Sequence, residues 1–436
     1  MNARYHHMPR ALFDALAAGG GGPDAIRELA AARYSKHVIL LWGVLSAAQS
    51  AGAEEARLAR HGYDLLTAVQ RHDPGVAEEA IRHPSVGAWA LREVRMPRAS
   101  PADPDVDPGR LSTVAAAAAI KAGLTAEIEV KTAGGTVMLP ALGAAIVDGR
   151  TAVVRSDEGH AQVSSAGRRV EVPADPHRDA PGWLGLRQAR MGAHDILIDD
   201  LDPFRMPSSA DLAHRLARSD VSRLNAALRM AWPLLDAHHP GIAAEIAAVV
   251  RVIVPLINKR GGQISSSSSA TFGAVALSQP PDPYTCAVTL AHEIQHLKLS
   301  ALLDIVALTL PDDGQRYYAP WRADPRPIGG LLQGAYAFLG VSGFWRRQRQ
   351  LTNGSVRLRA ETEFARWCVA VARVIETLRA SGQLTPAGRD FVQGMARTLD
   401  AWQDEPVTGE AHALARREAE LHLARWQSDN GPLPAV

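Results

Sequence analysis

The spacing of apolar side chains divides the chain into a helical first part, a middle part with strand-like alternation and a long helical remainder. In the first part, apolar residues recur every three to four positions, which places them on one face of a helix. The stripe through Leu29, Tyr34, Leu41 and Leu45 is an example, and His37 within it is expected to be a packed or capping histidine. Helices are predicted over 10–18, 23–51, 54–69 and 75–82, and over the alanine-rich residues 111–122.

The middle part changes to a period of two, which is typical of half-buried strands. Short apolar runs are separated there by Gly, Asp and Ser residues that favour turns. Strands are predicted over 126–130, 135–139, 151–154, 160–163, 169–172, 183–187 and 195–198. A stretch rich in Pro and Asp, 97–108, is expected to link these strands to the helices before them.

From residue 208 onward the helical spacing returns, interrupted by one extended segment. Helices are predicted over 220–235, 242–256, 284–308, from 327 onward, over 358–378 and twice between 383 and 426. We therefore expect an α+β fold that is mainly helical, with a small β-rich middle region. Three consecutive parts are expected: a helical region (1–100), a β-rich α+β region (109–205) and a helical catalytic domain (206–436).

The helix predicted over 284–308 contains the motif His-Glu-x-x-His. Asp282 and Pro283 provide an N-cap and a proline in the first turn. Residues four apart lie on one face of a helix, so His292 and His296 can offer two imidazole nitrogens to one metal ion, with Glu293 beside the open positions. The alternative is a pair of histidines satisfied inside an apolar core.

The extended segment 265–278 lies just before this helix in the sequence. Its residues favour a strand, and we expect an edge strand that flanks the motif helix and can hold an extended peptide through main-chain hydrogen bonds. For its serine-rich start, 265–269, a flexible linker is an equal alternative.

Composition excludes few classes of protein. The 436 residues carry a formal net charge of +1, which gives no electrostatic case for nucleic acid or membrane binding. The two cysteines, Cys286 and Cys368, are too few for a disulfide framework and are expected to be small buried side chains. No long apolar run or signal-like segment is evident, so a soluble, cytoplasmic protein is expected.

Two further groups of charged residues could carry chemistry. Asp199, Asp200 and Asp202 could bind a divalent cation, but a solvated strand exit followed by a helix start is favoured, because no Glu or Gly completes a calcium loop. Arg322 and Arg326 lie in a proline-rich, aromatic loop and could form a rigid fork for a carboxylate. A buried salt bridge to the nearby Asp324 is the alternative there.

The two histidines need a third ligand to complete a metal site. Leu299 and Leu302 occupy the positions where a metzincin-type motif would have Gly and His, so the ligand must come from elsewhere. Glu363, on the helix predicted over 358–378, is the candidate. Three weaker candidates are Glu361, Asp324 and Gln333.

Residues 292–304, 321–327, 330–338 and 363–367 together resemble the HExxH-motif peptide-modification proteins. That family is associated with ribosomally synthesised and post-translationally modified peptides, often beside or fused to radical SAM maturases. It is described as a group of iron-using, 2-oxoglutarate-dependent peptide β-hydroxylases. The resemblance covers about residues 195–426. This chain departs from the pattern at Gln333, where some relatives have His.

The resemblance implies that His292, His296 and a carboxylate hold Fe2+ and that Arg322 or Arg326 pairs with the distal carboxylate of 2-oxoglutarate. Glu293 would then orient a histidine or a water instead of binding the ion. The expected substrate is a ribosomal precursor peptide, hydroxylated at a side-chain β-carbon. Two alternatives remain: a Zn2+ peptidase in which Glu293 is the general base, and a catalytically inactive peptide-binding homologue.

Overall fold

The chain forms an α+β fold that is mainly helical, which confirms the expected fold class. The computed structural model describes residues 6–95, 107–207, 211–258, 261–402 and 404–433. Most of the linker predicted over 97–108 lies outside these residues. The helices are α1 (Arg10–Ala17), α2 (Gly22–Ala51), α3 (Ala53–His72), α4 (Pro74–Arg82), α5 (Pro84–Arg95), α6 (Leu111–Lys121), α7 (Arg218–His238), α8 (Pro240–Val249), α9 (Pro283–Leu302), α10 (Ile328–Leu351), α11 (Gly354–Ala380), α12 (Pro386–Asp400) and α13 (Gly409–Asn430).

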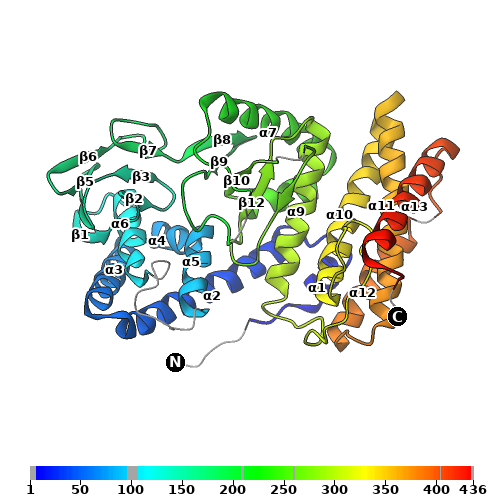
Figure 1. The fold of residues 1–436 in the computed structure, drawn as a ribbon, viewed down its shortest axis with the longest axis horizontal. Coiled ribbons are helices and arrows are strands. Elements are labelled where there is room, and N and C mark those ends of the chain that lie inside the picture. Colours follow the sequence, from blue (N-terminus) through cyan, green and yellow to red (C-terminus); the bar gives the residue numbers. More distant parts are fainter. Residues whose placement is uncertain (1–5, 96–106, 208–210, 259–260, 403, 434–436) are drawn as a thin grey trace. The chain divides into compact units, whose positions relative to one another are not determined.

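Short strands are concentrated between α6 and α7 (Figure 1). They are β1 (Ala126–Lys131), β2 (Thr136–Leu139), β3 (Gly143–Ile146), β4 (Thr151–Asp157), β5 (His160–Ser165), β6 (Arg168–Val172), β7 (Trp183–Gly185), β8 (Arg187–Met191) and β9 (His194–Ile198), followed later by β10 (Val252–Leu256), β11 (Ser265–Ser266) and β12 (Ala274–Ser278). The strand predicted over 183–187 covers β7 and only the first residue of β8, and these two strands belong to different sheets. Strand β3 was not predicted, because its run Gly-Ala-Ala-Ile has few of the side chains that favour strands.

The described residues divide into two compact units that are each assembled from separate stretches of sequence. Unit 1 contains 1–32, 227–249 and 280–436, and unit 2 contains 33–226 and 250–279. These units do not follow the three consecutive parts expected from the sequence, so that division stays a prediction.

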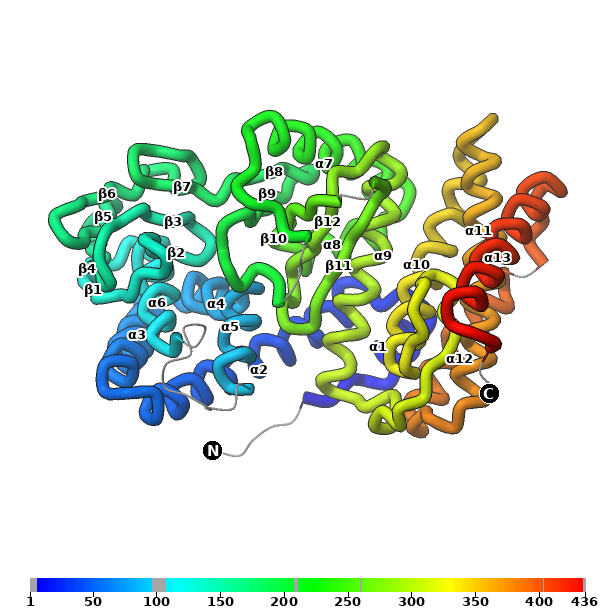
Figure 2. Tube along the Cα trace, in the orientation of Figure 1, coloured from blue at the N-terminus to red at the C-terminus, as the bar shows by residue number. Residues whose placement is uncertain are grey.

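Unit 2 is built around the alanine-rich helix α6. One set of its residues, including Val114 and Ala118, packs into a cluster with helices, and another, Ala116 and Ala117, packs into a cluster with strands. Figure 2 shows the trace of α6 between α3 and strands β1 and β4. Small side chains on both faces let helices and sheets approach α6 closely.

The described part of unit 2 contains three sheets. One has the order β1-β4-β5-β6, with antiparallel pairing throughout, and a second has the order β2-β3-β7. The third has the order β11-β12-β10-β9-β8, with β10 parallel to both β12 and β9. The segment predicted to be extended, 265–278, therefore supplies the outermost strand β11 and the interior strand β12.

The helix predicted over 242–256 is wrong in its second half. Helix α8 ends at Val249, and residues 252–256 form the central strand β10, whose five residues are all buried. A strand buried on both faces is a continuous apolar run, which periodicity alone does not distinguish from a helix. The β-branched residues Val252, Ile253 and Val254 favour the strand.

Unit 1 is formed mainly by long helices that pack along one another. Helix α10 packs against both α9 and α11, and α13 packs against α11 (Figures 1 and 2). Among the described residues, no helix is both long and apolar enough to cross a membrane.

Helix α9 ends at Leu302, earlier than the predicted Leu308. Residues 303–306 form turns and a bend, and the chain then pairs with the segment before α12: the Leu308 carbonyl accepts a hydrogen bond from the Thr385 N–H at 3.1 Å, and the Leu310 N–H donates to the Gln383 carbonyl at 2.8 Å. Gly388 is needed at this contact, since a Cβ there would lie 1.8 Å from the Leu308 carbonyl oxygen. Pairing between distant segments thus ends the helix.

Candidate metal centre

The motif helix α9 begins at the cap that the sequence predicts. Asp282 Oδ1 accepts a hydrogen bond from the Thr285 N–H at 2.8 Å, and Oδ2 accepts one from the Thr285 hydroxyl at 2.6 Å. Pro283 occupies the first turn, where its missing N–H has no helical partner to lose. The Arg359 guanidinium contacts the same carboxylate at 3.2 Å. These contacts fix the start of the helix.

His292 and His296 direct their Nε2 atoms toward each other from successive turns of α9. The two Nε2 atoms are 3.1 Å apart, and the ring centroids are 4.7 Å apart. Two nitrogens bound at about 2.0–2.1 Å to one ion lie about 2.8–3.4 Å apart when they subtend about 90° to 110°. The observed separation therefore fits two ligands of a single ion.

The charge state of His292 suits a metal ligand. Burial lowers its pKa to about 4, and the neighbouring His296 contributes in the same direction. His292 is therefore neutral at physiological pH, the form that coordinates metals. Glu293 is buried, and its Oε1 lies 4.0 Å from His292 Nε2.

Gln333 of α10 connects His296 to Ser300, which was not among the site residues predicted from the sequence. The Gln333 side-chain oxygen lies 3.1 Å from His296 Nδ1, and its amide nitrogen donates to the Ser300 hydroxyl at 3.3 Å. Ser300 is four residues beyond His296, so this spacing of four along α9 is the signal that could have identified it.

Aromatic rings line one side of the histidine pair. The ring of Phe338 meets His292 edge to face at 5.0 Å, and it stacks on Trp321 at 4.9 Å. Trp367 lies against the same Phe338 ring at 4.1 Å. Gly334 makes room for Trp321, because a Cβ there would lie 2.4 Å from the indole. The rings connect the arginine loop and α11 to the histidines.

Glu363, the expected third ligand, lies at the far end of this aromatic group. Its carboxylate accepts a hydrogen bond from the Trp367 indole N–H at 2.6 Å. Burial raises its pKa, although the nearby Arg366 opposes that rise. The ring of Phe338 contacts both Trp367 and His292, so the carboxylate is connected to the histidine pair through two ring contacts.

The weaker ligand candidates have other partners. Glu361 accepts hydrogen bonds from the Thr408 N–H and hydroxyl at the start of α13, and Arg357 contacts its other oxygen. Asp324 is paired with two arginines, and Gln333 contacts His296. Within the described ranges, no group of three or more His, Cys, Asp or Glu side chains is arranged to hold an ion. Glu363 therefore stays a prediction.

Arg322 and Arg326 converge on the carboxylate of Asp324, and a role in binding a ligand carboxylate stays a prediction. Arg322 Nε donates to Asp324 Oδ1 at 2.8 Å and Arg326 Nη1 to Oδ2 at 3.1 Å. Partial burial alone would raise the pKa of Asp324, but the two arginines outweigh it and hold the pKa below its usual value. The salt bridge considered as the alternative is present, although it is not buried: the Arg322 side chain is 53% exposed.

The three aspartates of unit 2 directly follow strand β9, as expected of a strand exit. They are nevertheless buried and not solvated, residues 203–207 after them form turns and bends instead of a helix, and they bond within the protein. Asp202 receives two hydrogen bonds from Arg110, at 2.7 and 2.9 Å, and Asp200 pairs with Arg215 at 2.6 Å. Asp199 accepts the N–H groups of Leu201 and Asp202. Arginines that are distant in sequence therefore neutralise this cluster.

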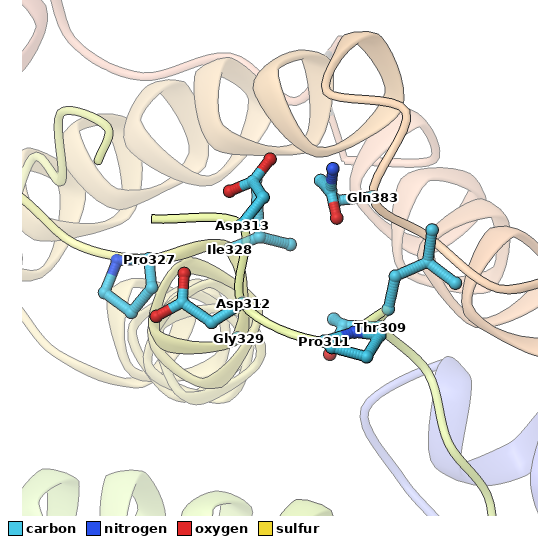
Figure 3. Close-up of a pocket in the computed structure, with 9 residues that line it drawn as sticks. Thr309, Pro311, Asp312, Asp313, Pro327, Ile328, Gly329 and Gln383 are labelled. Atoms are coloured by element: carbon cyan, nitrogen blue, oxygen red, sulfur yellow. The ribbon is translucent and has the colours of Figure 1, made fainter. Parts of the chain in front are cut away.

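A cavity of about 140 Å³ lies in unit 1 at the start of α10 (Figure 3). Asp312, Asp313 and Gln383 line it, together with Ile328 at the helix start. Its lining includes neither histidine of the motif nor Glu363. Asp312 is already bonded to Arg316 at 2.9 Å, so this cavity does not extend the candidate metal centre.

No family model matches the chain, and no curated protein matches it. The resemblance to the HExxH-motif peptide-modification proteins therefore stays a prediction from sequence.

Proposed function

We propose that this protein is an iron(II)- and 2-oxoglutarate-dependent hydroxylase that acts on a side-chain β-carbon of a ribosomally synthesised precursor peptide. The observation that supports it best is the 3.1 Å separation of the His292 and His296 Nε2 atoms, which suits two ligands of one ion. Two histidines and a carboxylate with further open positions are the ligand set of non-haem iron oxygenases.

The two histidines of the proposed donor set fit such an ion. His292 is neutral, and both histidine side chains are partly accessible, so an ion can reach them. Glu363 is the proposed third ligand, because a partly buried carboxylate with a raised pKa gains from a nearby cation. To bind the ion, the Glu363 carboxylate would have to give up its hydrogen bond with the Trp367 indole N–H.

The arginine loop supports the choice of cosubstrate. Arg322 and Arg326 already hold the Asp324 carboxylate between them, so the same fork can bind the distal carboxylate of 2-oxoglutarate if Asp324 yields its place. Trp321, next to Arg322, stacks on the Phe338 ring that contacts His292. A peptidase needs no such carboxylate fork.

The remaining side chains around the site would shield His292 from water and orient His292 or a water molecule. Bound iron with 2-oxoglutarate supplies the oxidising power that replaces a C–H bond by C–OH with O₂. Phe338 and Trp321 shield one side of His292 from water, and Glu293 orients His292 or a water molecule from the interior. The peptide is expected to bind in extended form through main-chain hydrogen bonds, and a radical SAM maturase is the expected partner in the pathway.

A zinc peptidase is the second candidate. Glu293 Oε1 lies 4.0 Å from His292 Nε2, close enough for the carboxylate to act as a general base on a water bound beside the histidine. In that case the arginine loop has no role in the reaction.

The test uses the full chain and the small precursor peptide that we expect to be encoded beside its gene. Metal-stripped protein is loaded anaerobically with Fe2+ and 2-oxoglutarate, mixed with the peptide and exposed to O₂. We expect a peptide heavier by one oxygen atom, with succinate formed in equal amount, measured by mass spectrometry. His296→Ala should abolish both products, because it removes one ligand, whereas the exposed His412→Ala on α13 should leave them unchanged.

The same experiment separates the alternatives. Cleavage of the peptide with Zn2+ alone would support the peptidase, and the absence of both products would support an inactive peptide-binding homologue. Glu363→Ala is included to test the third ligand: loss of stoichiometric iron supports the assignment, and retained iron moves that ligand to another residue.

A further inference from the structure

The arginine loop, residues 317–327, is closed at its base by its own backbone. The Tyr317 N–H donates to the Arg326 carbonyl at 2.8 Å, and the Arg326 N–H donates to the Tyr317 carbonyl at 2.9 Å. These two bonds fix the ends of the loop, whereas Arg322 lies in its middle. The place of the Arg322 side chain therefore depends on what holds the middle of the loop.

Helix α13 contacts this loop through three side chains spaced four residues apart, which are His422, Trp426 and Asn430. The Tyr318 hydroxyl lies 2.9 Å from His422 Nδ1, and the Tyr318 ring meets the Trp426 ring edge to face at 5.2 Å. The Asn430 amide nitrogen donates to the Ala323 carbonyl at 2.8 Å. Residues four apart lie on one face of a helix, so the three form one stripe along α13. The stripe holds the loop both near its start and in its middle.

The anchor of the loop is buried, whereas its arginines are open to a ligand. Tyr318 and Trp426 are both buried, and the Arg322 and Arg326 side chains are 53% and 37% exposed. A tyrosine hydroxyl can donate or accept, so it can bond to His422 Nδ1 whether or not that nitrogen carries the proton. The anchor therefore does not depend on one protonation state of the imidazole.

We propose that the stripe formed by His422, Trp426 and Asn430 positions the arginine loop, so that Arg322 and Arg326 present a preformed fork to the distal carboxylate of a dicarboxylate ligand. Groups that are already held in place lose less conformational entropy on binding, and the affinity of the fork is higher for that reason. The three residues act through the loop and are positioning residues. This inference rests on the proposed function only in naming 2-oxoglutarate as the dicarboxylate.

Two keto acids isolate the contribution of the fork. The full chain is loaded with Zn2+, which does not support oxidation, and titrated by calorimetry with 2-oxoglutarate or with 2-oxopentanoate, which has a methyl group in place of the distal carboxylate. We expect 2-oxoglutarate to bind more tightly. Hydrogen exchange of the backbone amides in 317–327, measured by mass spectrometry, reports the order of the loop without any ligand.

Variants of α13 then test the positioning role. His422→Leu removes the partner of the Tyr318 hydroxyl, and Asn430→Asp places an acceptor of the same size against the Ala323 carbonyl. Each should raise the Kd for 2-oxoglutarate about 2- to 10-fold, the range that one hydrogen bond supplies, leave the Kd for 2-oxopentanoate unchanged and speed exchange in the loop. His422→Asn restores a polar group near the Nδ1 position and should recover part of the affinity.

The matched controls are His412→Leu and Gln427→Glu, which change exposed residues of the same helix and should alter neither readout. Variants His422→Leu and Asn430→Asp that unfold more easily but keep the Kd for 2-oxoglutarate and the slow exchange of the loop would overturn the proposal. Equal Kd values for the two keto acids in the unchanged protein would overturn the assignment of the fork. If binding and exchange are as expected but no oxygen is added to the peptide, only the proposed hydroxylase function fails.

Discussion

Single residues in the interior of unit 2 show how burial controls charge. Asp199 is fully buried, and burial, together with the charge of the neighbouring Asp202, raises its pKa to about 7. Its Oδ1 accepts two backbone N–H groups, but its Oδ2 has no hydrogen-bond partner among the described residues. Asp202 is different, because Arg110 helps to hold its pKa below the usual value against the effect of burial. One carboxyl of the pair therefore favours the neutral form.

We expect Asp199→Asn to stabilise the protein above about pH 7 and to have little effect near pH 4. The folded protein keeps the Asp199 proton up to a pKa of about 7, whereas the unfolded chain loses it near the ordinary value of about 3.9. The folded state thus binds more protons in this range, and its stability falls as the pH rises through it. An asparagine keeps the Oδ1 acceptor without the charge.

Urea unfolding of both proteins at a series of pH values measures the difference in free energy of unfolding. Asp202→Asn is the contrasting variant, since it removes the partner of Arg110 and should destabilise the protein at neutral pH. A difference between Asp199→Asn and the unchanged protein that does not vary with pH would contradict the raised pKa.

At the scale of elements, α9 has polar side chains on two faces. One face carries the histidines, and a different face carries Gln295 and Lys298, which are both buried. Lys298 Nζ bonds to Glu245 of α8 at 2.7 Å and to the Gly20 carbonyl at 2.8 Å, while Gln295 donates to the Gly19 carbonyl at 2.9 Å. The glycine-rich turn after α1 and helix α8 thus hold the motif helix in place.

Replacing Lys298 with Met should destabilise unit 1 by about 3–5 kcal/mol, because it leaves the Glu245 carboxylate buried without its cation. Thermal and urea unfolding measure this change. The double variant Lys298→Met with Glu245→Gln should recover part of the loss, since the glutamine keeps an acceptor for the Gly22 N–H, which donates to Glu245 Oε1 at 3.0 Å.

Arg316→Met is the matched control for this pair. The ion pair of Arg316 with Asp312 is about half exposed, at 44% and 51%, and such pairs contribute only about 0–1 kcal/mol. Equal losses for Lys298→Met and Arg316→Met would show that the buried pair does not hold α9.

For the whole molecule, every residue of the proposed metal site belongs to unit 1. His292, His296, Gln333 and Glu363 all lie in its stretch 280–436, whereas the buried aspartates belong to unit 2. A ligand that binds only the folded state stabilises the region it binds, by an amount that depends on its concentration relative to Kd. The two units should therefore respond differently to a metal ion.

We expect Zn2+ to slow hydrogen exchange of backbone amides in α9 and α10 and to leave those of β4 and β5 unchanged. Mass spectrometry of the metal-stripped and zinc-loaded protein, digested after exchange, measures the protection peptide by peptide. His296→Ala with zinc is the control and should show no protection. Equal protection of both units would mean that the ion binds elsewhere or that the units open together.

The sequence by itself determined the elements whose signals are local. The cap at Asp282 and Pro283 and the spacing of His292 and His296 depend on a few neighbouring residues, so the start of α9 and the shared face of its histidines were predictable. The same holds for most other helices and for the short strands between turns.

Tertiary structure alone decided what depends on distant partners. Residues 252–256 form a strand because β12 and β9 pair with its two edges, and α9 ends at Leu302 because residues near Leu308 pair with those near Thr385. The aspartates are buried because arginines such as Arg110 reach them from other segments. The contact of Gln333 with His296 likewise requires α10 to pack on α9, since no periodicity along one helix encodes which residue of another will meet it.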